Sequence, residues 1–226
     1  MKNRKVKTII ALTALTGVLT VGGISAYFTD ADEASNTFTV GKISIDLQEP
    51  NWNPDDGKDL TPSEEIKKDP QIKNDGVNDA FVFAEVTVPY ANVTIANADG
   101  TKKEAADTEL FSYTINNGWV EVGTAKKDTT NKTITHLYAY ATDDAMTALA
   151  KDATTPAVFD KVIFANIVED EGLETTTQKI DVKGYAIQTQ NVNGGKTAPA
   201  DVWEVIKNQA PSTEKGAEDP KTDIKQ

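Results

Sequence analysis

Short runs of alternating apolar and polar residues dominate the chain between residues 43 and 189. The clearest run is 80–88, in which both faces of a strand are apolar. One face carries Val82, Ala84, Val86 and Val88, and the other carries Phe81 and Phe83. Apolar residues on both faces indicate a strand that lies between packed layers.

Further strands are predicted from the same alternation and from the turn residues that bound each run. They cover 43–47, 111–115, 119–122, 133–141, 157–168 and 180–189. The runs 111–115 and 119–122 are predicted to pair as a β-hairpin, because the three residues between them end in Gly118. A glycine there supplies the positive φ that such a loop requires.

Two short helices are predicted in the connections. Thr142, Asp143 and Asp144 can cap a helix over 145–151, with the acids at its favourable N-terminal end. Pro199 opens a second helix. Its core-facing residues are predicted to be Val202, Trp203 and Ile206.

About eight short strands separated by turn residues predict an all-β fold, a jelly-roll-like β-sandwich with two short helices in connections. We expect one domain over 26–208. The remaining stretch, 209–226, is polar and rich in Pro, Lys and Glu, and is predicted to be a disordered tail.

The N-terminus has the pattern of a signal peptide. Basic residues lie within 2–7, an uncharged apolar stretch follows, and the small residues Ser25 and Ala26 come after it. The uncharged run is also just long enough to span a bilayer as a retained anchor. Its densest apolar part is short and ends in two glycines, so we expect a signal peptide over 1–25 with cleavage after Ser25 or after Ala26.

The segment that follows the leader, 26–40, carries strand-forming side chains. Its residues of interest are Ala26, Tyr27, Phe28, Phe38 and Val40. The apolar parity changes between Val40 and Ile43, which predicts a bulge near Gly41. A processed N-terminus that carries a strand signal is a candidate for pairing with a sheet, its own or that of a neighbouring copy.

Composition excludes several function classes. The 226 residues carry a net charge of −12, and removal of the basic leader makes the charge more negative. Such a surface repels nucleic acid and anionic membranes, so we expect neither as a partner after cleavage. Cysteine is absent, so no disulfide and no thiolate metal site can form.

Catalytic chemistry is poorly supported by the residues. A zinc protease usually needs two histidines and a general base, but His136 is the single histidine and lies in a strand pattern. No Gly-x-Ser-x-Gly motif occurs, and Asp143 and Asp144 are better explained as helix-start residues. The acidic loop 50–62 departs from an EF-hand at Asp56 and Pro62, although an irregular calcium site stays open. We expect no metal, no cofactor and no enzymatic activity.

A sugar-binding groove is an alternative. The aromatic residues Trp119, Tyr138 and Tyr140 could line one, although alternating aromatics on strands usually form core or cross-strand pairs.

Several stretches resemble the TasA/camelysin family of exported proteins. They are 22–30 and 36–41 at the leader junction, then 68–76 and 159–164. The resemblance implies a secreted jelly-roll subunit of extracellular biofilm-matrix fibres, processed by a dedicated signal peptidase. It also implies head-to-tail assembly with other copies, in which the mature N-terminal strand of one subunit completes the sheet of the next. The family carries a metalloendopeptidase label as well, so a secreted camelysin-like metalloendopeptidase and a cell-surface carbohydrate-binding adhesin are the alternative functions.

Overall fold

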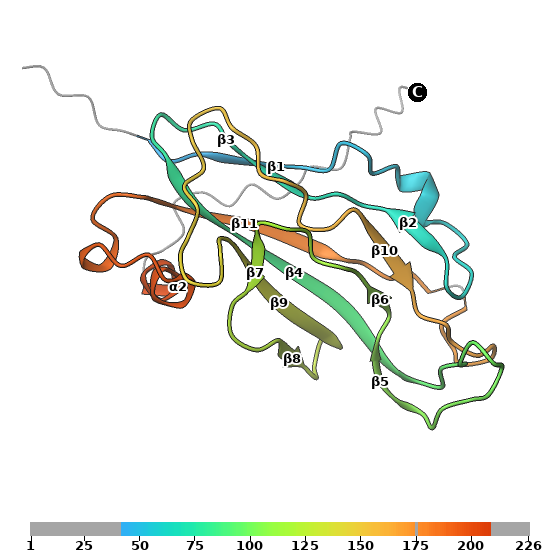
Figure 1. Ribbon diagram of the computed structural model, residues 1–226. Coiled ribbons are helices and arrows are strands. Elements are labelled where there is room, and N and C mark those ends of the chain that lie inside the picture. Colours follow the sequence, from blue (N-terminus) through green and yellow to red (C-terminus); the bar gives the residue numbers. More distant parts are fainter. Residues whose placement is uncertain (1–41, 175, 209–226) are drawn as a thin grey trace, which may run out of the picture. The chain divides into compact units, whose positions relative to one another are not determined.

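The computed structural model describes residues 42–174 and 176–208 (Figure 1). Its strands in chain order are β1 (Ile45–Gln48), β2 (Glu65–Lys67), β3 (Gln71–Asn74), β4 (Ala80–Val93), β5 (Ala106–Glu109), β6 (Phe111–Ser112), β7 (Trp119–Glu121), β8 (Lys126–Asp128), β9 (Thr133–Tyr140), β10 (Lys161–Phe164) and β11 (Asp181–Gln188). The helical elements are two 3-10 turns, η1 (Pro54–Gly57) and η2 (Val192–Gly194), and the α-helix α2 (Pro199–Asn208).

One layer is built around β4, the longest strand. Its sheet has the order β11-β4-β9-β7, and all three ladders are antiparallel. β8 also pairs with β9, and β5 pairs with the far end of β4. Because β4 has neighbours on both sides, it is the buried centre of this layer, as its apolar sequence predicts.

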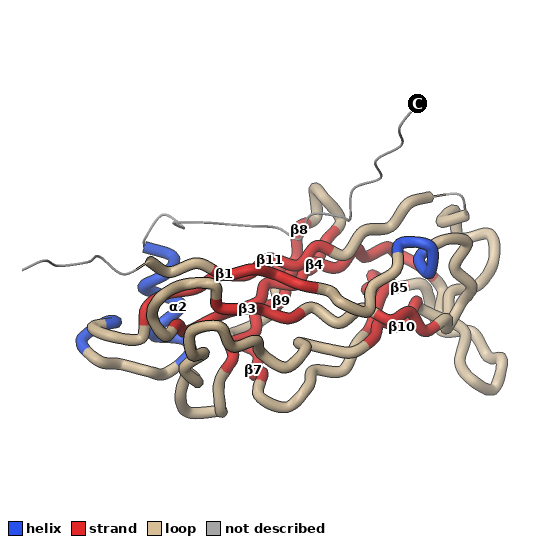
Figure 2. Tube along the Cα trace, turned by 90° about the horizontal axis from the view of Figure 1, so that it is seen from above, coloured by secondary structure: helices blue, strands red, loops and turns tan. Residues whose placement is uncertain are grey.

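The opposing layer consists of two short sheets, β1-β3 and β2-β10-β6. Figure 2 shows β1 and β3 running side by side. Backbone hydrogen bonds from Asn74 to Ala153 and from Val158 to Pro70 continue the pairing between these two sheets. The opposing layer is therefore a row of neighbouring extended segments, and the two layers together form an all-β sandwich.

The alternation along β4 separates two cores. Val82, Ala84, Val86 and Val88 are fully buried in the main core between the layers. Phe81 and Phe83 belong to a second core on the other face. The prediction of a strand apolar on both faces is thus confirmed.

Helix α2 covers the second core. Val202 and Ile206 are buried there, and the Trp203 ring lies 5.2 Å from the ring of Phe83. The predicted helix after Pro199 and its core-facing residues are confirmed. The contact between the tilted rings adds a modest attraction to the stabilisation that comes from burying their apolar surface.

The other predicted helix, 145–151, is wrong. This segment is extended, with an isolated bridge between Met146 and Ala141. The backbone groups of Leu149 exchange two hydrogen bonds with Ala80, at 3.0 and 2.8 Å. Pairing with the start of β4 buries Met146 and Leu149, and this tertiary gain overrides a weak helix preference.

The predicted hairpin 111–122 is also wrong, although Gly118 does have a positive φ of 94°. β6 pairs with β10 in one layer, whereas β7 pairs with β9 in the other. The residues between them cross from layer to layer. The Trp119 indole N–H, which donates to the Pro156 carbonyl at 3.0 Å, helps to fix this crossing.

Several predictions fall on other parts of the chain. Four of them lie outside the described residues: the leader 1–25, the segment 26–40, the bulge at Gly41 and the tail 209–226. The strand predicted over 157–168 is shorter, being β10 alone, and the sequence pattern does not predict β2, β3, β5 or β8. Among the residues that the structure describes, no helix has the length and apolar character needed to cross a membrane.

Candidate functional site

The residues predicted to mediate assembly, Ala26, Tyr27, Phe28, Phe38 and Val40, lie outside the described part of the chain. The structure describes instead the point at which their segment joins the sandwich. That junction starts at Lys42, three residues before β1. Its geometry decides how firmly an N-terminal segment is attached.

The junction is held by backbone hydrogen bonds from its first described residue. The β1–β3 ladder runs from Ile45 opposite Asn74 to Gln48 opposite Gln71. Two further backbone bonds extend it, from Asp75 N–H to the Ser44 carbonyl at 2.9 Å and from Val77 N–H to the Lys42 carbonyl at 3.0 Å. The junction is therefore bonded beyond the ends of the named strand.

A turn opposite Lys42, held by the buried side chain of Asn74, makes this extension possible. The Asn74 side chain is fully buried, and its amide donates to the carbonyls of Asn78 and Leu149, both at 2.9 Å. Its side-chain oxygen accepts the N–H of Gly76 at 2.9 Å. A Cβ atom on Gly76 would lie 2.7 Å from the Lys42 carbonyl oxygen, so only glycine permits this approach of the two chains.

The other end of the junction is fixed by two charged contacts. Lys68 Nζ lies 2.7 and 2.9 Å from the two carboxylate oxygens of Glu49, and these side chains are only 10% and 11% exposed. Asp69 accepts hydrogen bonds from the backbone and the side chain of Asn51, at 2.9 and 2.7 Å. The Lys68 ammonium also lies 5.0 Å from the Trp52 ring centre, a cation–π contact.

We call this set the N-terminal clamp: Glu49, Asn51, Lys68, Asp69, Asn74 and Gly76. Four of the six lie in the stretch 68–76, which the sequence marked only as a turn signal and a family resemblance. Their partners are 18 or 19 residues away in the sequence for the two charged contacts, so no local pattern could have paired them.

A groove of about 460 Å³ opens beside the end of β10. Its apolar lining comes from Leu60, Phe164, Ile167 and Leu173, and charged groups are contributed by Lys58, Asp59, Glu169 and Glu174. The predicted acidic loop 50–62 supplies one wall. The groove combines apolar contact area with acidic side chains around it, which is the usual make-up of a binding site.

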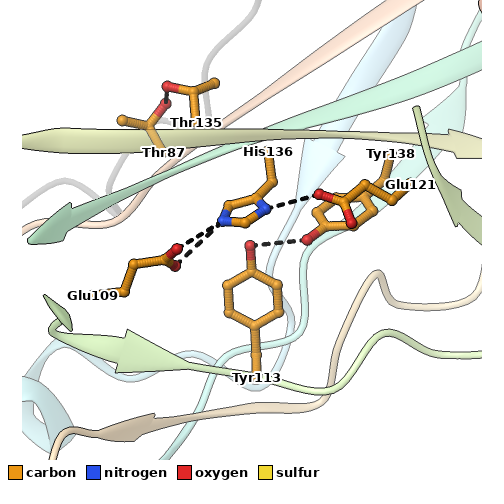
Figure 3. A network of polar contacts seen from close by, with 7 residues as sticks. All are labelled: Thr87, Glu109, Tyr113, Glu121, Thr135, His136 and Tyr138. Atoms are coloured by element: carbon orange, nitrogen blue, oxygen red, sulfur yellow. Dashed lines mark hydrogen bonds and ion pairs between the residues drawn. The ribbon is translucent and has the colours of Figure 1, made fainter. Parts of the chain in front are cut away.

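His136 lies on β9 between two carboxylates (Figure 3). Its Nε2 atom is 3.1 and 3.2 Å from the two oxygens of Glu109, and its Nδ1 atom is 3.0 Å from Glu121. The hydrogen bond to Glu109 and then that to Glu121 raise the pKa of His136 to about 9, against the effect of burial. The neighbouring hydroxyls of Tyr113 and Tyr138 are 3.2 Å apart.

This arrangement does not fit a zinc site. A catalytic zinc needs three protein ligands that converge on one point and leave a fourth position open. Here each ring nitrogen of His136 is taken by a carboxylate, and the two carboxylates lie on opposite sides of the ring. Within residues 42–174 and 176–208, no group of three His, Cys, Asp or Glu side chains is placed to hold a metal ion. The predicted strand position of His136 is confirmed.

The aromatics considered for a sugar groove have other partners. Trp119 packs against Tyr140 at 5.8 Å between ring centres, and Tyr138 is buried. They form cross-strand and core contacts between β7 and β9. Asp143 and Asp144 lie in a bend and not at a helix start.

Comparison with known proteins identifies the family. No curated protein matches the chain. Among solved structures, a type II cohesin domain from the cellulosome of Acetivibrio cellulolyticus shares 15% identity over 69% of this chain and 79% of its own. Its TM-score of 0.22 is too low to bear on the fold. The family model described as camelysin metallo-endopeptidase matches residues 1–183. The chain therefore belongs to the TasA/camelysin family.

Proposed function

We propose that this protein is a secreted structural subunit of extracellular biofilm-matrix fibres, in which the segment 26–40 of one copy adds a strand to the next. The observation that carries the proposal is the N-terminal clamp. Glu49, Lys68 and Asn74 bury charged and polar groups at the root of that segment. A segment that links two subunits must be attached firmly to its own domain, and these contacts provide that attachment.

Strand addition explains how such a segment binds. Main-chain hydrogen bonds to a sheet edge give affinity, and alternate side chains enter apolar pockets. A head-to-tail contact of this kind does not close on itself, so it propagates into a filament. Burial of Phe28 contributes roughly 1.5–3 kcal/mol per contact.

The groove beside β10 is our proposed acceptor for the first aromatic residues of a second copy. Leu60, Phe164 and Leu173 offer apolar contacts for Tyr27 or Phe28. The acids around the groove suit the α-ammonium group that cleavage creates at the new N-terminus. The segment 26–41 can extend about 50 Å at roughly 3.3 Å per residue, which is enough to reach a neighbouring subunit.

A peptidase is the alternative, because the family is described as a metallo-endopeptidase. The donor set around His136 argues against it, since the two glutamates oppose each other across the ring. We therefore propose that the chain is not a protease. A carbohydrate-binding role is not favoured, because Trp119 and Tyr140 contact each other.

Export is the first step to test. N-terminal sequencing of the secreted protein is expected to read from Ala26 or from Tyr27, because the small residues there follow a short apolar core. Recovery of the protein only in the membrane fraction, with residues 1–25 retained, would contradict the proposal.

The assembly test changes one side chain in the segment. Deletion of 26–33, or Phe28→Asp, is expected to leave a folded monomer that forms no fibres, because a charge in an apolar pocket cancels the gain from burial. Phe28→Leu is the matched control and is expected to assemble. Fibre growth of Phe28→Asp at the wild-type rate would show that the N-terminal strand folds onto its own domain instead.

A further inference from the structure

The contacts of His136 have a consequence that is independent of assembly. We infer that Glu109, His136 and Glu121 form a pH-sensitive charge latch, which ties the ends of β5 and β7 to β9 while the imidazole is protonated and releases the end of β7 when the imidazole is neutral.

The latch joins elements that the backbone joins weakly. Glu109 is the last residue of β5, which pairs with β4 and has no ladder with β9 among the described residues. Glu121 is the last residue of β7, whose ladder with β9 covers three residue pairs and is followed by one more backbone bond, from the Val122 N–H to the Leu137 carbonyl at 2.8 Å. His136 lies on β9 and reaches both glutamates (Figure 3). One side chain therefore connects three strands.

The number of N–H donors on the imidazole depends on its protonation state, and the two carboxylate contacts need two donors. An ionised carboxylate only accepts hydrogen bonds, and a neutral imidazole carries a single N–H. The two carboxylates face different ring nitrogens at 3.0 and 3.1 Å, so both contacts are satisfied only by the imidazolium. On deprotonation one carboxylate faces a nitrogen lone pair, and that contact becomes repulsive.

The exposure of the two glutamates indicates which contact opens. The Glu121 side chain is 46% exposed, whereas that of Glu109 is 30% exposed. Turning toward water is easier for Glu121, so the neutral ring keeps its N–H toward Glu109. The end of β7 is therefore the part that is released.

The two tyrosines beside His136 keep their protons over the pH range in which the imidazole titrates. Burial raises the pKa of Tyr138 to about 12, and burial and then the Tyr138 hydrogen bond raise that of Tyr113 further. On β5 and β8, Asp107 and Lys127 pair with each other at 2.6 Å, and that contact raises the pKa of the lysine. Between pH 7 and 10 the imidazole therefore changes charge while Tyr113, Tyr138 and Lys127 keep theirs.

The direction of the pH effect follows from the pKa of His136, which is about 9 in the folded chain and about 6.5 in a free peptide. A raised folded pKa means that the latch stabilises the fold fully below about pH 6.5. The contribution declines above that value and is lost as the pH rises through about 9.

Proton NMR can follow the latch directly, because the chain has a single histidine and hence one imidazole titration. The folded protein is expected to titrate near pH 9. Glu109→Gln and Glu121→Gln are each expected to lower that pKa by about one unit or more, since each removes one negative neighbour. Glu85→Gln is the matched control and is expected to leave it unchanged, because Glu85 lies on β4 and contacts Tyr185 instead.

Hydrogen exchange tests the release of β7. After correction for intrinsic exchange rates, protection of the β7 amides is expected to fall about tenfold or more between pH 7 and 10, while the centre of β4 stays protected. His136→Gln is expected to remove this pH dependence. A wild-type pKa near 6.5, or β7 protection that is constant while the ring titrates, would overturn the latch. The pKa measurements on the two Glu→Gln variants keep the test decisive if His136→Gln fails to fold.

Discussion

Lys68 Nζ lies 2.7 Å from Glu49 Oε1 in a site where neither side chain exposes more than 11% of its surface. This pair joins the β2–β3 connection to the residue that directly follows β1. Taking two charges out of water is expensive, and their mutual attraction offsets the expense only while both are present. The contact is therefore a sensitive point of the N-terminal clamp.

We predict that Lys68→Met destabilises the fold by about 3–5 kcal/mol, because it leaves the Glu49 carboxylate buried without a partner. Urea unfolding followed by circular dichroism measures this. Lys161→Met is the matched control, since the Lys161–Glu65 pair joins β10 to β2 but is more than half exposed. An exposed pair is worth about 1 kcal/mol or less. If both variants lose the same free energy of unfolding, burial of the Lys68–Glu49 pair does not make its loss more destabilising.

Asn74 is the second sensitive point. We predict that Asn74→Ala lowers the free energy of unfolding by about 2–4 kcal/mol, because the buried Gly76 N–H and the part-buried Asn78 carbonyl lose their partner, and the Leu149 carbonyl keeps only the Ala80 N–H. Asn92→Ala is the control, since the Asn92 side chain is exposed and bonds only to Asp107 in the structure. A loss below 1 kcal/mol for Asn74→Ala would mean that the turn rearranges and satisfies these groups in another way.

The sequence identifies the layers of this fold better than their connections. The alternation in 80–88 predicts β4 and both of its cores, because a two-faced apolar strand has few alternatives. The same reasoning fails at 145–151, where pairing of Leu149 with Ala80 decides the structure. It also fails at 111–122, because nothing local shows that β6 and β7 join different sheets.

The candidate site shows the same limit. A single histidine in a strand pattern leaves a zinc protease without its usual ligands, and the structure places each ring nitrogen of His136 against a carboxylate. The two glutamates that bind His136 are 27 and 15 residues away from it in the sequence, so sequence spacing gives no sign of the latch. The clamp is hidden for the same reason, since Glu49 meets Lys68 only through the fold.

A measurement of bound zinc distinguishes a structural fibre subunit from the metallo-endopeptidase that the family description names. We predict that purified protein equilibrated with zinc and then dialysed holds far less than one equivalent, because no second imidazole exists to share the ion with His136. His136→Ala is expected to leave any residual zinc and any background proteolysis unchanged. Stoichiometric zinc that this one substitution releases would instead establish a metal site at His136.

The last prediction tests donor and acceptor in separate chains. Phe28→Asp is expected to lose the donor function while its groove stays intact. Leu173→Asp is expected to lose the acceptor function while its N-terminal segment stays intact, because a carboxylate replaces a partly buried leucine that lines the groove. Neither variant alone forms fibres under this hypothesis.

A mixture of the two variants then has one allowed contact. The segment of a Leu173→Asp chain can enter the groove of a Phe28→Asp chain, and no further subunit can join at either end. Equimolar mixing is therefore expected to give a heterodimer and no fibres, which sedimentation and electron microscopy distinguish. A mixture of Leu173→Asp with Leu173→Asn is the control, since two chains changed at the same groove position are expected to show no such complementation. If the two principal variants stay monomeric when mixed, while each remains folded by circular dichroism, the groove is not the acceptor. Loss of fibres in Phe28→Asp would still show that the N-terminal segment is needed for assembly. The donated strand would then bind elsewhere on the sandwich.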